Sequence, residues 1–169
     1  MRSGQLAALA RDALDLADAL GLDRFAVVGH DWGARAAYIA AALWPERVTH
    51  CVALSVGWGT NSPAQPLPLR QARNYWYHWY MALERGAALV RQDGRSLARF
   101  LWETWGPPGW FRDEEFELTA RSFANPDWAE VTLHSYRHRW GLAPGDPAYE
   151  PLERRLDPTP AIAVPTLVI

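Results

Sequence analysis

The apolar positions near the beginning of the chain recur at the spacing of an amphipathic helix. From Leu6 to Leu20, leucine and alanine side chains return every three or four residues, which is the periodicity of one buried helix face. Ser3 offers a capping side chain before this run, and Gly21 ends it. The pattern therefore predicts a helix over residues 4–20.

Two short apolar runs flank a second helical pattern. Residues 25–28 read Phe-Ala-Val-Val, and residues 48–56 read Val-Thr-His-Cys-Val-Ala-Leu-Ser-Val. Runs of this kind are typical of buried strands in parallel sheets. Between them, the alanine-rich residues 32–44 predict a helix that stops before Pro45. Strand, helix and strand in this order predict a parallel βαβ unit.

The chain changes character after Val56. A loop rich in glycine and proline is expected there, and the segment after it holds most of the ten tryptophans. The loop is marked by Gly57, Gly59, Pro63, Pro66 and Pro68. Helices are expected over residues 69–84, 86–93, 95–105, 113–123 and 127–140. A proline-rich stretch then leads to a further core strand over residues 164–169.

These elements predict three segments. Residues 1–58 form part of an α/β core, residues 59–160 form a helical cap, and residues 161–169 begin a strand that returns to the core. The fold class is therefore α/β, with a parallel sheet and an inserted all-helical domain.

Candidate chemistry lies in the turn between the first predicted strand and the helix after it. Gly29 and Gly33 flank Asp31 at the spacing of a nucleophile elbow, in which a sharp strand-to-helix turn exposes the central side chain. A carboxylate is ionised at neutral pH, so Asp31 can displace a leaving group from saturated carbon and form an ester. The backbone N–H of Trp32 is the candidate oxyanion donor. The alternative interpretation is an ordinary turn with a helix-capping aspartate.

The residues from Gly29 to Arg35 read Gly-His-Asp-Trp-Gly-Ala-Arg, and Trp-Pro-Glu-Arg-Val follows at residues 44–48. This pattern resembles the α/β-hydrolases that use an aspartate nucleophile, namely the epoxide hydrolases and the haloalkane and haloacid-type dehalogenases of that fold. The resemblance extends from about residue 5 to Ile169. It implies a partial α/β-hydrolase fold in which Asp31 forms an alkyl-enzyme ester that water cleaves.

The same resemblance implies elements that this sequence does not contain. In the family, a His-Gly-x-Pro loop precedes the elbow, and the charge-relay acid and the catalytic histidine follow the strand that ends this chain. Neither part is found here, so a fragment is expected. None of the five histidines is assigned as the general base.

The resemblance also implies acids in the cap. Epoxide hydrolases protonate the opening ring oxygen with two cap tyrosines, or with a tyrosine and a histidine. Tyr136 is the candidate in the late cap helix, and Tyr77, His78 and Tyr80 are the candidates in the first one. Aromatic residues in such helices also pack as core, and that interpretation stays open. The Trp32 indole is the candidate halide ligand if the protein is a dehalogenase.

Two classes of function follow from these residues. The favoured one is an epoxide hydrolase-like enzyme acting on a small hydrophobic molecule, with a haloalkane dehalogenase as the alternative for the same nucleophile. The other class is a catalytically inactive fragment or ligand-binding remnant without the charge-relay acid and histidine. A serine esterase is disfavoured because Asp31 occupies the elbow and Ser55 lacks the glycine frame.

Composition narrows the remaining choices. The 169 residues are 49% hydrophobic and 21% charged, with a net charge of −2, so a folded domain is expected and nucleic-acid or anionic-membrane partners are not. The single cysteine, Cys51, excludes an intramolecular disulfide and is expected to be buried. No metal cluster or cofactor motif is recognised. Without a membrane-length apolar run or a signal-peptide core, a cytoplasmic protein is expected, and its oligomeric state is not indicated.

Overall fold

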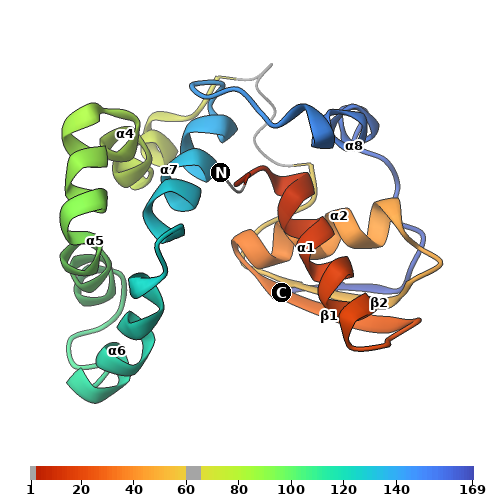
Figure 1. The fold of residues 1–169 in the computed structure, drawn as a ribbon, viewed down its shortest axis with the longest axis horizontal. Coiled ribbons are helices and arrows are strands. Elements are labelled where there is room, and N and C mark those ends of the chain that lie inside the picture. Colours follow the sequence, from red (N-terminus) through yellow and green to blue (C-terminus); the bar gives the residue numbers. More distant parts are fainter. Residues whose placement is uncertain (1–2, 60–65) are drawn as a thin grey trace. The chain divides into compact units, whose positions relative to one another are not determined.

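The computed structural model describes residues 3–59 and 66–169, which form two compact units (Figure 1). The α/β unit comprises residues 5–67 and 145–169, and the helical unit comprises residues 1–4 and 68–144. The two units divide after residues 67 and 144, and the boundaries after residues 58 and 160 stay a prediction from the sequence. The part of the predicted loop around Pro63 lies outside the described residues.

The α/β unit contains a three-stranded parallel sheet in the order β1-β2-β3. β1 spans Phe25–His30, β2 spans Val48–Leu54 and β3 spans Thr166–Val168. β1 and β2 pair with Gly29 opposite Ala53. The predicted parallel βαβ unit and the returning strand are therefore both confirmed, although the returning strand is shorter than expected.

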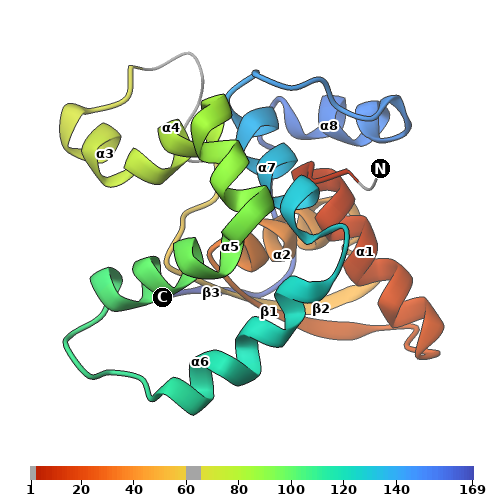
Figure 2. The same ribbon diagram turned by 60° about the vertical axis from the view of Figure 1, so that its left-hand side comes forward.

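Two helices of the α/β unit pack side by side on one face of this sheet (Figure 2). α1 spans Leu6–Ala19 and α2 spans Trp32–Leu43. The N-cap residue of α1 is Gln5 and not Ser3, so the prediction that Ser3 caps the helix was wrong. Gln5 Oε1 accepts a hydrogen bond of 2.6 Å from the Asp146 backbone N–H. The buried residues of this core are Leu14, Ala34, Ala37, Tyr38, Ala40, Ala41, Val48, Cys51 and Ala53.

The strands are not buried on both faces of the sheet. Val27 packs against the core, whereas the neighbouring Val28 is 69% exposed and β3 is exposed along its length. The prediction of fully buried strands was therefore wrong. The reason is that successive side chains of a strand point to opposite faces, and within the described residues α1 and α2 cover only one of these faces.

Arg47, in the Trp-Pro-Glu-Arg-Val segment, has a structural role. Its guanidinium donates hydrogen bonds to the carbonyls of Leu22 and Asp23, at 2.9 and 2.6 Å, and pairs with the Asp18 carboxylate at 2.6 Å. These three acceptors lie in the last turn of α1 and in the connection to β1. Arg47 therefore fixes where the strand that leads to Asp31 begins.

A short helix that the sequence pattern did not predict completes the α/β unit. α8 spans Glu150–Leu156 and follows the 3₁₀ turn η2, Pro147–Tyr149. The proline-rich composition suggested a loop, but a proline in the first turn of a helix loses no intrahelical hydrogen bond. The Arg155 guanidinium donates to the Leu43 carbonyl at 3.2 Å, which satisfies one acceptor at the end of α2.

The helical unit follows the predicted succession of helices with two differences. The predicted helix 69–84 is interrupted at Tyr75, and the predicted break near residue 94 is a kink at Asp93 inside one long helix. At the kink, Asp93 Oδ1 accepts the Ser96 N–H at 3.1 Å. The helices are α3 Leu69–Asn74, α4 Trp76–Ala82, α5 Glu84–Trp105, α6 Asp113–Ala120, the 3₁₀ helix η1 Arg121–Ala124, and α7 Trp128–Arg139.

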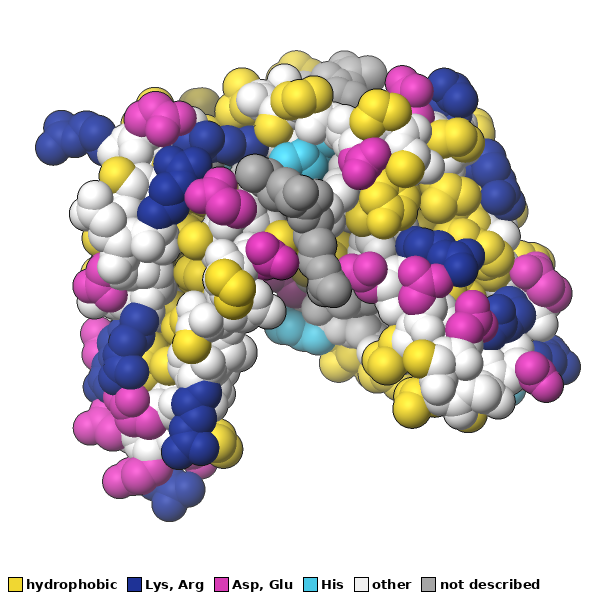
Figure 3. All heavy atoms as spheres, viewed as in Figure 1, with side chains coloured by type: hydrophobic (Ala, Val, Ile, Leu, Met, Phe, Trp, Pro, Cys, Tyr) yellow, Lys and Arg dark blue, Asp and Glu magenta, His cyan; other side chains and the backbone are white. Residues whose placement is uncertain are grey.

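The core of the helical unit lies where α4, α5 and α7 meet. Its buried residues are Tyr77, Met81, Ala87, Val90, Leu97 and Leu133. The outer surface of α5 and α6 carries interspersed positive and negative side chains (Figure 3), including the Arg99–Asp113 pair at 2.6 Å. Within the described ranges, no helix combines the length and apolar character needed to cross a membrane.

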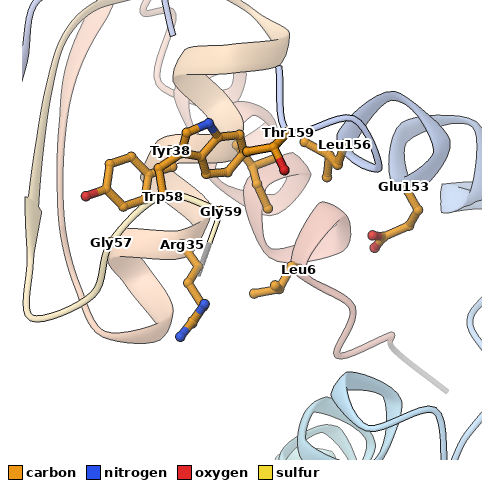
Figure 4. Close-up of a pocket in the computed structure, with 10 residues that line it drawn as sticks. Leu6, Arg35, Tyr38, Gly57, Trp58, Gly59, Glu153, Leu156 and Thr159 are labelled. Atoms are coloured by element: carbon orange, nitrogen blue, oxygen red, sulfur yellow. The ribbon is translucent and has the colours of Figure 1, made fainter. Parts of the chain in front are cut away.

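A cavity of about 160 Å³ opens between α1, α2 and α8 (Figure 4). Arg35 and Glu153 reach it from α2 and α8, and Trp58 covers part of it from the segment after β2. The Glu153 carboxylate accepts the Ala7 N–H at 3.3 Å. Burial raises the pKa of Glu153, the Ala7 hydrogen bond lowers it, and the Asp157 charge raises it, with a net increase.

Because the pKa of Glu153 is raised in the folded state, its contribution to stability is complete below the ordinary glutamate pKa of about 4.3 and is lost as pH rises through the folded value. We expect Glu153→Gln, which keeps an acceptor for Ala7, to raise the Tm at pH 7. The gain should shrink as pH falls toward 4. Thermal unfolding followed by circular dichroism across this range measures the effect.

The matched control is Glu150→Gln in the same helix. The Glu150 side chain is 67% exposed and pairs with Arg154 one turn away, and exposed pairs of this kind contribute little to stability. We expect this variant to leave the pH dependence of the Tm unchanged. A Glu153→Gln variant that is less stable than the parent protein at pH 7 would contradict the burial argument.

Candidate functional site

Asp31 lies at the turn where β1 ends and α2 begins. Its N–H donates to the Leu54 carbonyl at the end of β2 (3.2 Å), and its own carbonyl accepts the Arg35 N–H at 3.1 Å. Asp31 is the N-cap residue of α2, but its side chain makes no capping hydrogen bond. The interpretation of Asp31 as an ordinary helix-capping aspartate is therefore wrong.

The backbone of Asp31 has a conformation that favours glycine. Its φ of 50° and ψ of −111° lie outside the regions that L-residues ordinarily occupy. Such residues cost about 1–3 kcal/mol each and are concentrated at functional sites. The sequence motif predicted a strained turn here, and this backbone conformation agrees with it.

The two glycines of the motif are not equivalent. A Cβ on Gly29 would overlap the Gly33 carbonyl group and would lie 2.6 Å from the Ala34 backbone nitrogen, whereas a Cβ on Gly33 would meet nothing within 4 Å. Gly29 is therefore required by the close approach of the end of β1 to the first turn of α2. Within the described residues, packing gives no reason for Gly33.

We expect Gly29→Ala and Gly33→Ala to have opposite consequences. The new methyl group of Gly29→Ala would be forced against backbone, so the free energy of unfolding should fall by at least about 2 kcal/mol. Gly33→Ala lies in the first turn of a helix, where alanine is favoured by up to about 1 kcal/mol. Urea unfolding of both variants measures the difference, and equal losses would contradict the inferred close approach.

The backbone conformation of Asp31 predicts that glycine is more stabilising than alanine at this position, which is the reverse of their usual order in a helix. We expect Asp31→Gly to be more stable than Asp31→Ala by about 1 kcal/mol, because glycine has no Cβ strain at positive φ. At Asp12, an exposed position in α1, we expect the alanine variant to be more stable than the glycine variant by about 1 kcal/mol. Chemical denaturation of the four variants checks this, and the same ranking at both positions would rule out strain at Asp31.

Three of the predicted cap residues come together in the helical unit. Tyr77 and His78 of α4 are both buried, and Tyr136 of α7 is half-buried. The Tyr136 ring meets the His78 ring at a centroid distance of 4.6 Å and the Tyr77 ring at 5.6 Å, both nearly edge to face. The structure thus places hydroxyl and imidazole groups from two helices in one aromatic cluster.

The other sequence candidates lie elsewhere. Tyr80 contacts Trp76 at a ring-centroid distance of 6.3 Å. Trp32 directly follows Asp31 as the first residue of α2 and is half-buried. Tyr77 also lines a hollow of about 570 Å³ in the helical unit, together with Arg73, Asn74, Tyr75, Trp76 and Trp105. An aromatic lining of this kind is typical of sites for small apolar molecules.

The histidines outside this cluster have structural or exposed positions. His134 Nδ1 accepts the Gly4 N–H at 3.0 Å, and its Nε2 bonds the Pro144 carbonyl at 3.0 Å. Burial, followed by the neighbouring His134, lowers the pKa of His138. His30 and His50 are exposed strand residues. Among residues 3–59 and 66–169, no group of three or more histidine, cysteine or acidic side chains is placed to hold a metal ion.

One contact in the aromatic cluster was not expected from the sequence. Trp140, the residue after α7, donates its indole N–H to His78 Nδ1 at 3.1 Å. The abundance of tryptophan in this segment was visible in the sequence, but 62 residues separate the two partners and no local pattern links them.

Comparison with known proteins identifies the family. The model of the alpha/beta hydrolase fold family matches residues 2–153. A crystal structure of a candidate epoxide hydrolase from Klebsiella pneumoniae superposes with a TM-score of 0.91 at 41% identity, over 99% of this chain and 56% of that one. The chain therefore belongs to the α/β-hydrolase fold family, and the predicted fold class and resemblance are confirmed.

Two further relatives carry the same description. A candidate epoxide hydrolase from Pseudomonas aeruginosa superposes with a TM-score of 0.76 at 26% identity, over 98% of this chain and 55% of that one. Epoxide hydrolase B from Mycobacterium tuberculosis is 32% identical in an alignment of 92 residues that covers 46% of this chain and 26% of the relative. The chain thus spans about half the length of the solved structures that it resembles.

Proposed function

We propose that this chain carries the nucleophile and the ring-opening acids of an epoxide hydrolase-like enzyme, with Asp31 as the nucleophile and the helical unit as its cap. The observation that carries the proposal is the backbone of Asp31, held at positive φ between β1 and α2 with no capping role for its carboxylate. Relatives described as epoxide hydrolases, to which the chain is similar, support the same activity.

In the first step, a carboxylate oxygen of Asp31 attacks a carbon of the epoxide ring and the carbon–oxygen bond of the ring breaks. The ring oxygen takes a proton from an acid in the Tyr77, His78 and Tyr136 cluster. The product is a β-hydroxyalkyl ester of Asp31. This step needs no general base because a carboxylate oxygen is itself the nucleophile and has no proton to lose on attack.

In the second step, water attacks the carbonyl carbon of the Asp31 ester and the bond between that carbon and the alkyl oxygen breaks, so that the diol leaves. One proton of the water goes to the diol oxygen, and the other restores the acid of the cap cluster. The backbone N–H of Trp32 is proposed to stabilise the oxyanion that forms on the Asp31 carbonyl oxygen. The regenerated carboxylate then holds one oxygen atom from water. The base for this step is not assigned to any of the five histidines of the chain.

An epoxide is favoured over a halide because of the cap residues. Opening an epoxide leaves an alkoxide that needs a proton, and the cluster supplies hydroxyl and imidazole groups for it. Displacing a halide needs only hydrogen-bond donors to the departing anion, for which Trp32 is the candidate. The substrate is proposed to be small and hydrophobic, in keeping with the aromatic lining around Tyr77.

The test follows the oxygen atoms and the ester. The chain is incubated with styrene oxide in water enriched in oxygen-18, digested, and analysed by mass spectrometry. We expect either the styrene oxide adduct or a single heavy oxygen on the peptide that contains Asp31. Asp31→Asn should lose both, because a neutral amide is a far weaker nucleophile.

Asp23→Asn is the matched control, since Asp23 is an exposed carboxylate in the connection before β1. It should leave the labelling of the Asp31 peptide unchanged. If 1-chlorohexane labels the Asp31 peptide and styrene oxide does not, the dehalogenase is favoured. A folded chain that labels with neither substrate would contradict the proposal and support an inactive remnant.

A further inference from the structure

The hydrogen bond between Trp140 and His78 fixes where the imidazole holds its proton. The Trp140 indole nitrogen lies 3.1 Å from His78 Nδ1. An indole N–H can only donate, so His78 Nδ1 must present a lone pair. The neutral His78 ring therefore carries its proton on Nε2, and that nitrogen is the one able to donate.

The end of α7 determines where Trp140 lies. The Gly141 N–H bonds the His138 carbonyl and the Leu142 N–H bonds the Arg137 carbonyl, both at 2.9 Å, with Gly141 at φ +69°. This is the Schellman arrangement that ends a helix. It places Trp140 at the last helical turn, where its ring packs on Trp79 at a centroid distance of 4.8 Å.

A second link ties α7 to α4 near this contact. The Arg137 guanidinium donates to the carbonyls of Met81 and Ala82, at 3.2 and 3.3 Å, and pairs with Glu84 at 3.0 Å. These carbonyls lie at the end of the helix that carries His78. The ends of α4 and α7 that carry His78 and Trp140 are therefore held together by contacts of the Arg137 side chain, which involve neither ring.

The His78 ring has little freedom to reorient. It is 4% exposed, stacks on Tyr75 at 4.3 Å with 9° between the planes, and meets Tyr77 edge to face at 4.4 Å. Flipping the ring would replace Nδ1 with a carbon atom opposite the Trp140 N–H. Protonating Nδ1 would set two N–H donors against each other in a buried site, which is costly.

We propose that Trp140 is a positioning residue that holds His78 as the neutral Nε2–H tautomer, so that His78 enters the Tyr77, His78 and Tyr136 cluster as a hydrogen-bond donor. A role of His78 in epoxide opening rests on the proposed function, whereas the tautomer itself does not. The orientation of a catalytic imidazole by a bond to its other nitrogen is a general way of setting its role.

The test measures the tautomer directly, without substrate. The full chain is labelled with ¹⁵N-histidine, and two-bond ¹H–¹⁵N correlations are recorded at neutral pH, with His78→Asn used to assign the His78 signals. We expect a pyridine-type shift for Nδ1 and a pyrrole-type shift for Nε2 in the parent chain. Trp140→Phe should move both shifts toward averaged values, because the ring is retained but the donor is lost.

Trp79→Phe is the matched control. Its indole N–H donates to the Ala72 carbonyl at 2.8 Å, and its ring contacts Trp140, so it removes a neighbouring tryptophan N–H without removing the bond to His78. We expect it to leave the His78 shifts unchanged. A protonated Nδ1 in the parent chain, or identical His78 shifts in Trp140→Phe, would overturn the proposal even if that variant were destabilised.

A second measurement separates this proposal from the proposed function. We expect Trp140→Phe to slow formation of the Asp31 ester about tenfold, which is less than the roughly 10²–10⁴-fold that a general acid contributes because His78 itself is retained. We expect Trp79→Phe to leave the rate unchanged. If His78 has the predicted tautomer but no Asp31 ester forms, the role of Trp140 in holding the tautomer is supported and the proposed epoxide hydrolase-like function is rejected. An unchanged ester rate in a variant that has lost the tautomer would show that Trp140 does not act on ring opening.

Discussion

The close approach of β1 and α2 at Gly29 is the constraint on which the candidate nucleophile depends. Because the first turn of α2 lies directly against the end of β1, the chain must reverse within a single residue, and Asp31 is that residue. A longer connection would let the chain turn with ordinary backbone angles. The strain at Asp31 is therefore a consequence of how closely strand and helix pack, and it persists because the surrounding sheet and helix hold both ends of the turn.

The rest of the α/β unit supports this turn from both sides. The N–H of Asp31 is bonded to the end of β2, and Arg47 fixes the beginning of β1 by binding the chain after α1. Tyr38, two turns further along α2, donates its hydroxyl to the Val56 carbonyl at 3.0 Å and so ties the chain leaving β2 to the same helix. Each of these contacts limits a direction in which the turn could relax.

Much of this could be predicted from the sequence because it is local. The elbow is a contiguous motif, and the periodic runs from Leu6 to Leu20 and from residue 32 to residue 44 correspond to α1 and α2. The exposed side of β1 was not predicted, because an unbroken apolar run looks the same whether one face or both are covered. α8 was missed because proline in a first helical turn gives the same composition as a loop.

The cap candidates show a different limit. The presence of Tyr77, His78 and Tyr136 was visible, and the family resemblance pointed to them, but the direction in which His78 donates depends on Trp140, which lies 62 residues away. Hydrogen-bond polarity between distant side chains has no local signature in sequence. A histidine in an aromatic helix is consistent with an acid, a base or a packed core residue. Its chemistry is decided by one donor that the fold brings to Nδ1, just as the position of Asp31 is decided by one glycine that lets the strand reach the helix.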